Sequence, residues 1–303
     1  MMKIALLCAA LALALPYAAA ESGEANIPTH GDLPYIADDN PAHLLDIYLP
    51  AKAEKPAPIV VFIHGGGWMV GHKGSASLSK ISGLHRLMKT LRESGYAVIA
   101  INYRLSGEAV FPAQMQDIEA AMDWIGKNAD TYHIDSRRIA LTGDSAGAHL
   151  AEIFAVNRGK NAIRAVLSYY GVSDIGNVNA ERIAKNCPES VQELMGKLMD
   201  NPPENSPEGL LMGEDSHSSE FYRKATVASP LYHVNENTPP MMLLHGDEDC
   251  WVPHSQSLKL HAALQAAGIE TQLLILEKTG HSATRFFDED INAQALQFLQ
   301  KHL

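Results

Sequence analysis

Cysteine, basic side chains and long apolar runs are all scarce in this chain of 303 residues. Its three cysteines are too few for a fold stapled by disulfides or for a cysteine-rich zinc module. Lysine and arginine number 24 against 35 aspartates and glutamates, giving a formal charge of -11, and no basic stripe is present that could bind nucleic acid. The 46% of hydrophobic and 19% of charged residues exclude a mainly disordered chain and indicate a globular protein.

The first twenty residues have the composition of a secretory leader. A short basic start that includes Lys3 precedes an apolar run at 4–15, and Pro16 ends the run. Ala18 and Ala20 then provide an A-x-A cleavage site. An apolar run of this length cannot cross a hydrocarbon layer of about 30 Å, which argues against a membrane anchor. We therefore expect residues 1–20 to be removed and residues 21–303 to be exported to the periplasm or the extracellular space.

Beyond residue 40, apolar strands alternate with amphipathic helices. The segments 59–63 and 96–101 are apolar almost throughout, as is typical of strands buried on both faces. The alternation predicts one α/β domain with a mostly parallel central sheet and helices on both faces. The expected strands are 44–49, 59–63, 96–101, 138–142, 163–170, 241–244 and 271–276, and the expected helices are 78–93, 112–125, 146–156, 255–267 and 283–299.

One stretch, residues 172–227, contains no clear strand–helix unit. It is rich in polar residues and has three prolines between 201 and 207. A structureless loop of that length is uncommon inside a compact domain. We therefore expect a small, partly helical insertion that lies over the edge of the sheet and over the active site.

The most informative motif is G-x-S-x-G at residues 143–147, directly between an expected strand and an expected helix. This context is typical of a nucleophile elbow, in which small neighbours allow a sharp turn and Ser145 projects above the sheet. The positive end of the helix dipole also favours a negative charge that develops there. The alternative is an ordinary strand-to-helix turn in which Ser145 caps the helix.

A glycine-rich loop follows the 59–63 strand, with the sequence His-Gly-Gly-Gly-Trp at 64–68. Glycines allow backbone N–H groups to approach a substrate closely. Together with the N–H of Ala146, these groups could bind the oxyanion of a tetrahedral intermediate. A phosphate-binding loop is the alternative, but no G-x-G-x-x-G pattern and no following Lys-Ser/Thr accompany it.

A serine nucleophile needs a base, and the base needs an acid that orients it. In hydrolases with this elbow the acid and then the histidine follow the serine along the chain. His281 follows the 271–276 strand and Gly280, where catalytic groups gather. His254, His261 and His302 lie in or beside helices or at the chain end. The residues alone leave the acid open, because Asp247, Glu248 and Asp249 all follow the 241–244 strand.

Three other features have competing interpretations. His245, Asp247, Asp249 and His254 could be metal ligands, but their spacing matches no metal motif such as H-E-x-x-H. We expect His149, one turn into the elbow helix, to be a packed or capping residue and not a second base. Cys187 and Cys250 remain after removal of the leader, and they could form a disulfide or be two separate buried thiols.

Several motifs in order along the chain resemble those of the BD-FAE-like α/β-hydrolases, relatives of the hormone-sensitive-lipase family. They are His64-Gly65-Gly66-Gly67-Trp68, Asn102-Tyr103-Arg104-Leu105, Gly143-Asp144-Ser145-Ala146-Gly147, His245-Gly246-Asp247-Glu248-Asp249 with Val252-Pro253, and Gly280-His281. The resemblance implies the α/β-hydrolase fold and a triad of Ser145, His281 and the aspartate three residues before Val-Pro, which is Asp249. It also implies that the oxyanion amides are those of Gly66, Gly67 and Ala146.

What the resemblance implies about activity is the hydrolysis of carboxylic esters without a metal or an organic cofactor. The expected substrates are small-molecule or carbohydrate esters with short acyl or hydroxycinnamoyl groups. Trp68 and Trp251 flank the expected site, so we expect their rings to contact the substrate and to favour short acyl groups; the alternative is that both rings face the core. Amide hydrolysis by the same triad and a non-catalytic binding protein are the other functions considered.

Overall fold

The computed structural model describes residues 27–75, 83–185, 187–193 and 206–303. The expected leader at 1–20 lies outside these ranges. Within them, no helix combines the length and the apolar composition that a membrane span requires.

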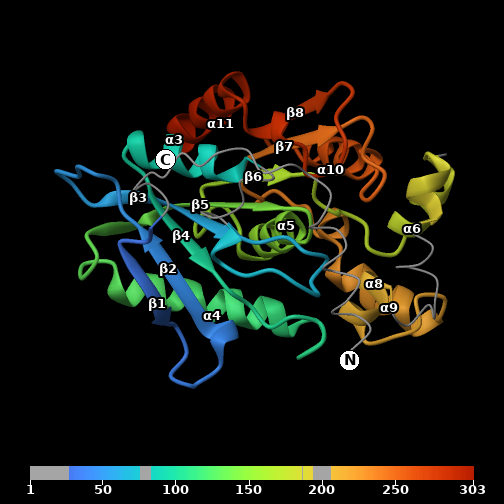
Figure 1. Cartoon of the computed structure of the whole chain (residues 1–303), viewed down its shortest axis with the longest axis horizontal. Helices are drawn as coiled ribbons and strands as arrows, with labels where there is room; N and C mark the ends of the chain where they lie inside the picture. The colour runs from blue at the N-terminus through green and yellow to red at the C-terminus, as the bar shows by residue number, and fades with distance from the viewer. Residues whose placement is uncertain (1–26, 76–82, 186, 194–205) are drawn as a thin grey trace.

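An eight-stranded sheet in the order β1-β2-β4-β3-β5-β6-β7-β8 forms the centre of the molecule (Figure 1). The strands from β4 to β8 along this order are parallel, whereas β1 and β2 pair antiparallel. The expectation of a mostly parallel sheet is confirmed. The strands are β1 (His30–Pro34), β2 (Leu44–Tyr48), β3 (Ala57–Ile63), β4 (Ala97–Ile101), β5 (Ile134–Asp144), β6 (Ala165–Tyr169), β7 (Met241–Gly246) and β8 (Thr271–Leu276).

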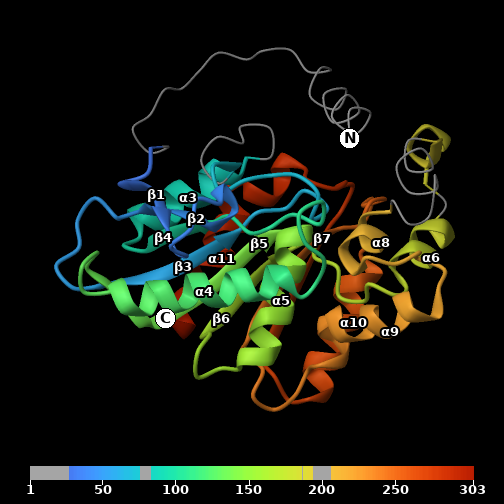
Figure 2. The same ribbon diagram turned by 90° about the horizontal axis from the view of Figure 1, so that it is seen from below.

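Strand β3 shows how the sheet separates two cores. Ile59, Val61 and Ile63 point into one core and Val60 and Phe62 into the other, because successive side chains leave opposite faces of a strand. Helices α4 (Ala113–Asn128), α5 (Ala146–Arg158) and α10 (Ser255–Ala266) cover the first face. Helices α3 (Leu84–Glu93) and α11 (Glu289–His302) cover the second. Figure 2 shows α4 and α5 in front of the sheet.

Two differences from the expected elements have local causes. The edge strand β1 was not predicted, because its sequence HGDLP is mostly exposed and lacks an apolar alternation. The helix expected at 283–299 is divided into a short 3-10 helix, η5 (Thr284–Phe287), and α11. Asp288 between them has an extended backbone with φ -69° and ψ 159°, which suits the residue that precedes a helix. The buried Phe286 and Phe287 fit a continuous apolar face, so periodicity alone hides this break.

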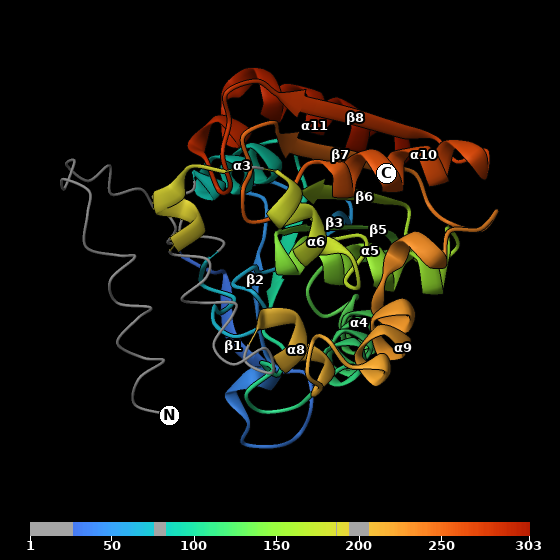
Figure 3. The same cartoon turned by 90° about the vertical axis from the view of Figure 1, so that its right-hand side faces the viewer.

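Residues 172–227 contain helices α6 (Val178–Ala184) and α8 (Pro207–Met212) and all but the last residue of α9 (Ser219–Ala228). These helices lie beyond the carboxyl ends of the parallel strands, next to α5 and α10 (Figures 1 and 3). Residues 186 and 194–205 of this stretch lie outside the described ranges.

Covalent and polar contacts attach α6 to the loop after β7. Cys187 and Cys250 form a disulfide, which settles their pairing in this structure. The Arg182 guanidinium donates through Nε to the carbonyl oxygen of Trp251 at 2.5 Å. The segment after β7 therefore has the insertion as a direct neighbour.

The disulfide can be tested by thiol titration of protein that begins at residue 21 and so lacks Cys8. Unfolded without reductant, this protein should show no free thiol, and after reduction two. The bridge closes a separation of 63 residues, so replacing both cysteines with serine should lower the free energy of unfolding by up to about 4 kcal/mol in the chain-entropy model. Two titratable thiols before reduction would contradict the pairing.

Candidate active site

The turn between β5 and α5 places Ser145 in a conformation that few non-glycine residues adopt, with φ 53° and ψ -118°. The flanking glycines make the turn possible. A Cβ on Gly147 would lie 2.0 Å from the Ile63 carbonyl oxygen, and one on Gly143 would lie 2.5 Å from the Gly147 carbonyl carbon. Any larger residue would push α5 away from β3. The G-x-S-x-G sequence therefore reflects a close approach of helix and strand.

Three side chains from separate loops form a chain of hydrogen bonds. The Ser145 Oγ lies 3.0 Å from Nε2 of His281, and Nδ1 of His281 lies 2.6 Å from Oδ2 of Asp249. The carboxylate only accepts, so Nδ1 carries the proton and Nε2 accepts from the serine hydroxyl. The three residues follow β5, β8 and β7, whose carboxyl ends meet at one edge of the sheet.

The Asp249 carboxylate is fully buried, and protein donors surround it. Oδ1 accepts from the backbone N–H groups of Trp251 and Val252, both at 2.9 Å. Burial by itself raises the pKa of Asp249, but the charge of His281 and the hydrogen bonds from His245 and His281 outweigh burial and hold the pKa well below its usual range. The carboxylate is therefore ionised when it faces the imidazole.

The other two acidic residues of this loop point elsewhere. Asp247 accepts from the backbone N–H of Thr279 at 3.3 Å, and its own N–H donates to the Leu276 carbonyl. Gly246 allows the same approach, since a Cβ there would lie 2.0 Å from the Thr279 carbonyl oxygen. Asp247 thus fastens the loop that carries the histidine, and Glu248 is exposed. Of the three candidates that the sequence left open, Asp249 is the one that contacts His281.

The glycine-rich loop lies against the elbow. The N–H of Gly65 donates to Oδ1 of Asp144 at 2.9 Å. Gly66 and Gly67 have φ values of 111° and 60°, and a Cβ on Gly66 would lie 2.1 Å from the Val70 carbonyl oxygen. Among the hydrogen bonds of the described residues, the N–H groups of Gly66, Gly67 and Ala146 have no acceptor. Their expected role as oxyanion donors stays a prediction.

Trp68 corrects one expectation. Its ring is only 2% exposed and belongs to the core, and its Nε1–H donates to Nδ1 of His149 at 3.2 Å. The substrate contact expected of Trp68 is therefore wrong, because a buried indole N–H needs a partner and His149 supplies it. Nε2 of His149 donates to the Ala228 carbonyl at 2.7 Å, and burial lowers the pKa of His149 to about 4. His149 is the packed residue that was expected; Trp251 is half-buried, and its role stays a prediction.

Two buried neighbours of the site were not found from the sequence. Tyr170 follows β6 with a φ of 45°, and its ring packs edge-on against His281 at a centroid distance of 4.7 Å. Nε2 of His245 lies 3.3 Å from Oδ2 of Asp249. Tyr170 belongs to no motif considered above, and His245 begins the motif at 245–249 but was weighed there only as a metal ligand. Within the described ranges, no group of three or more His, Cys, Asp and Glu side chains could hold a metal.

Comparison with known proteins gives one family and several esterases. A model of the BD-FAE family matches residues 45–264. The esterase LipQ of Mycobacterium tuberculosis is 30% identical over 255 residues, which cover 79% of this chain and 53% of LipQ. A probable isoprenylcysteine alpha-carbonyl methylesterase of Oryza sativa is 28% identical over 257 residues, with coverage of 82% and 57%. The chain spans about half the length of the curated relatives it matches.

A solved structure has a similar fold over almost the whole chain. It is a truncated form of a carbohydrate esterase from gut microbiota, with a TM-score of 0.76 and 26% sequence identity. The match covers 92% of this chain and 98% of that one.

Substitution of Asp249 and of Asp247 tests which aspartate orients His281 and which one only holds the loop that carries it. Asp249→Asn should lower kcat for p-nitrophenyl acetate by about 10³–10⁴, because the amide favours the wrong imidazole tautomer. Asp247→Asn keeps an oxygen for the Thr279 N–H, so its main effect should be on stability. Thermal melting of both variants controls for folding. A larger loss of kcat in folded Asp247→Asn than in folded Asp249→Asn would reverse the assignment.

Proposed function

Because the chain belongs to the BD-FAE family of α/β-hydrolases, we propose that it hydrolyses carboxylic esters. The observation that carries the proposal is the chain of hydrogen bonds from Ser145 through His281 to Asp249, at 3.0 and 2.6 Å. A serine hydroxyl is a weak nucleophile, and this arrangement supplies both the base and the group that orients it. The α/β-hydrolase fold expected from the sequence is confirmed.

In the proposed reaction, Ser145 Oγ attacks the ester carbonyl while Nε2 of His281 takes the hydroxyl proton. The N–H groups of Gly66, Gly67 and Ala146 stabilise the oxyanion, and each such donor is worth about 10²–10³ in rate. His281 then returns the proton to the departing alcohol, which leaves an acyl-enzyme. Water, deprotonated by His281, attacks the acyl carbon, and the acid and free serine are released.

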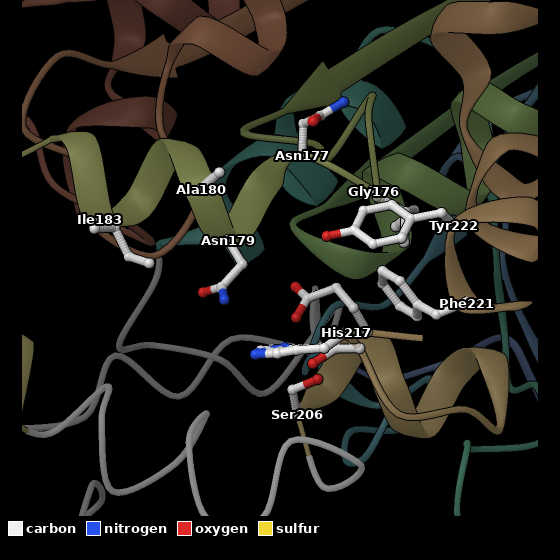
Figure 4. A pocket seen from close by; sticks show the side chains of 12 residues that line it. Gly176, Asn177, Asn179, Ala180, Ile183, Ser206, His217, Phe221 and Tyr222 are labelled. Carbon is white, nitrogen blue, oxygen red and sulfur yellow. The ribbon is translucent and has the colours of Figure 1, made fainter. Parts of the chain in front are cut away.

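For the alcohol we propose a carbohydrate, and for the acyl group a short acyl or a hydroxycinnamoyl group. Similarity to the solved carbohydrate esterase supports the first. So does a cavity of about 150 Å³ between α6, α8 and α9 (Figure 4). Its polar lining is formed by Asn177, Asn179, Ser206, Glu208, Ser216 and His217.

The side chains that line this cavity suit a polyhydroxylated group. The side chains of Asn179, His217 and Tyr222 point toward one another across it (Figure 4). Amide and imidazole groups can exchange hydrogen bonds with sugar hydroxyls, while the half-exposed Tyr222 ring offers an apolar face. The acidic wall of Glu208 is neutralised, because its carboxylate pairs with Arg182 at 2.6 Å.

The cavity lies close to both loops of the proposed reaction centre. Pro207, at the start of α8, lies beside Gly67, whose added Cβ would be 3.8 Å from the proline Cβ. Arg182 connects Glu208 in the cavity wall to the Trp251 carbonyl in the loop of Asp249. The segments that form the cavity wall are therefore attached to both loops of the proposed reaction centre.

We also propose that the protein is exported. The disulfide between Cys187 and Cys250 supports an oxidising compartment, where such bonds persist.

The nucleophile can be identified by covalent labelling. A fluorophosphonate should modify Ser145 in the wild-type protein, and folded Ser145→Ala should lose both the label and the burst of acyl-enzyme formation. A series of p-nitrophenyl esters should give the highest kcat/KM between acetyl and butyryl. Labelling of another serine would overturn the assignment, and no labelling or hydrolysis at all would favour a non-catalytic binding protein. A maximum at octanoyl or longer would contradict the short acyl group.

Two variants of the cavity test the carbohydrate alcohol. In Asn179→Ala and Tyr222→Ala, the ratio of kcat/KM for an acetylated methyl glycoside to that for p-nitrophenyl acetate should fall about tenfold, because a hydrogen bond or a ring contact to the sugar is lost. Tyr232→Ala is the matched control, since Tyr222 and Tyr232 are both 50% exposed and only Tyr222 lines the cavity. An unchanged ratio in both cavity variants would refute this location for the sugar.

A further inference from the structure

A second imidazole, that of His245, lies against the carboxylate of Asp249. Its Nε2 is 3.3 Å from Oδ2, the same oxygen that accepts from His281 at 2.6 Å. The side chains of His245 and Asp249 are both 0% exposed. His245 is also part of β7, so it approaches the acid from the rigid sheet and not from a loop.

The neighbours of His245 fix which nitrogen carries its proton. Nε2 lies 2.8 Å from the Val252 carbonyl oxygen, which can only accept, so Nε2 is the donor. Nδ1 lies 2.7 Å from the hydroxyl of Ser257 on α10. In the neutral ring Nδ1 therefore accepts from Ser257. Val252 closes the network, because its N–H donates to Oδ1 of Asp249.

We infer that His245, held in one tautomer by the Val252 carbonyl and anchored at Nδ1 by Ser257, is a positioning residue for Asp249. Its Nε2–H is shared between the Val252 carbonyl at 2.8 Å and Oδ2 of Asp249 at 3.3 Å, and through the longer contact it orients the carboxylate and draws negative charge away from the oxygen that faces His281. This role rests on the proposed function, because it matters to the reaction only if Asp249 orients the base.

Loss of the His245 N–H should change the pH profile, whereas loss of a side chain that only packs would not. With one donor fewer, the Asp249 carboxylate interacts more strongly with the protonated form of His281. His281 would then stay protonated, and so unable to act as the base, up to a higher pH. The other titratable groups that face these side chains stay in place, and they are Asp144, Tyr170, Asp247 and His254.

Two substitutions of His245 distinguish the effect of its Nε2–H donor from the effect of its side-chain volume. His245→Met removes the N–H, and it should lower kcat for p-nitrophenyl acetate about tenfold, as expected for a hydrogen bond to a charged group. KM should change little, and the acid limb of kcat/KM should move up by about half a pH unit. His245→Gln, whose amide N–H can replace Nε2–H, should restore most of kcat and the wild-type limb.

Two further variants provide a second test of the same role and a control for loss of a buried histidine. Ser257→Ala keeps the imidazole but removes the hydrogen bond that anchors its Nδ1. The ring can then turn away from the carboxylate, so the acid limb should move in the same direction as in His245→Met. His149→Gln is the control for loss of a buried histidine, and it should lower the melting temperature without moving the limb. If His245→Met does not fold, Ser257→Ala decides.

Different results would show that His245 has no positioning role and that the proposed function is wrong. A folded His245→Met or Ser257→Ala with wild-type kcat and acid limb would show that His245 only packs. Absence of Ser145-dependent hydrolysis in the wild-type protein would instead overturn the proposed function on which the inference rests.

Discussion

The buried charge of Asp249 is the constraint on which the site depends. A carboxylate without water is strongly unfavourable unless protein donors replace the lost solvent. Here Oδ2 faces the imidazoles of His281 and His245, and Oδ1 accepts from the N–H groups of Trp251 and Val252. These donors come from β7, from the segment that follows it, and from the loop after β8. Satisfying one carboxylate therefore determines how three parts of the chain meet, and it leaves Nε2 of His281 aimed at the serine.

Backbone strain gathers at the same end of the sheet. Trp68, Ser145, Tyr170 and Ser282 all have φ between 45° and 59°, and each lies in a loop or turn of the site or next to one of its members. Such conformations cost about 1–3 kcal/mol each and persist only where their surroundings enforce them. The parallel strands β3 to β7, buried on both faces by two cores, provide this enforcement. The site is thus organised before a substrate arrives, which is what stabilisation of an oxyanion requires.

The local motifs of the site can be predicted from the sequence, but contacts between distant residues cannot. The motifs at 143–147 and 64–68 are legible because close approach and positive φ restrict those positions to glycine. The choice of Asp249 needed a family resemblance, since three carboxylates follow the same strand. The burial of Trp68 depends on a histidine far along the chain, and no spacing encodes that contact. The disulfide has the same character, because it forms only when segments 63 residues apart meet. The contact of His245 with Asp249 is local, but the spacing of four residues does not reveal it, because the turn after β7 brings the two side chains together.

The segment from 247 to 252 belongs to both the reaction centre and the insertion. His281 and His245 keep Asp249 ionised, and this segment adds two N–H donors to the same carboxylate. The same segment bears Cys250, joined to Cys187, and the Trp251 carbonyl that accepts from Arg182. The position of α6, which forms one wall of the cavity, is therefore fixed relative to the segment that carries Asp249. If the proposed alcohol group binds in this cavity, its position is fixed relative to the loop of the acid. Its binding energy can then orient the ester, and orientation of the reacting groups accelerates a reaction.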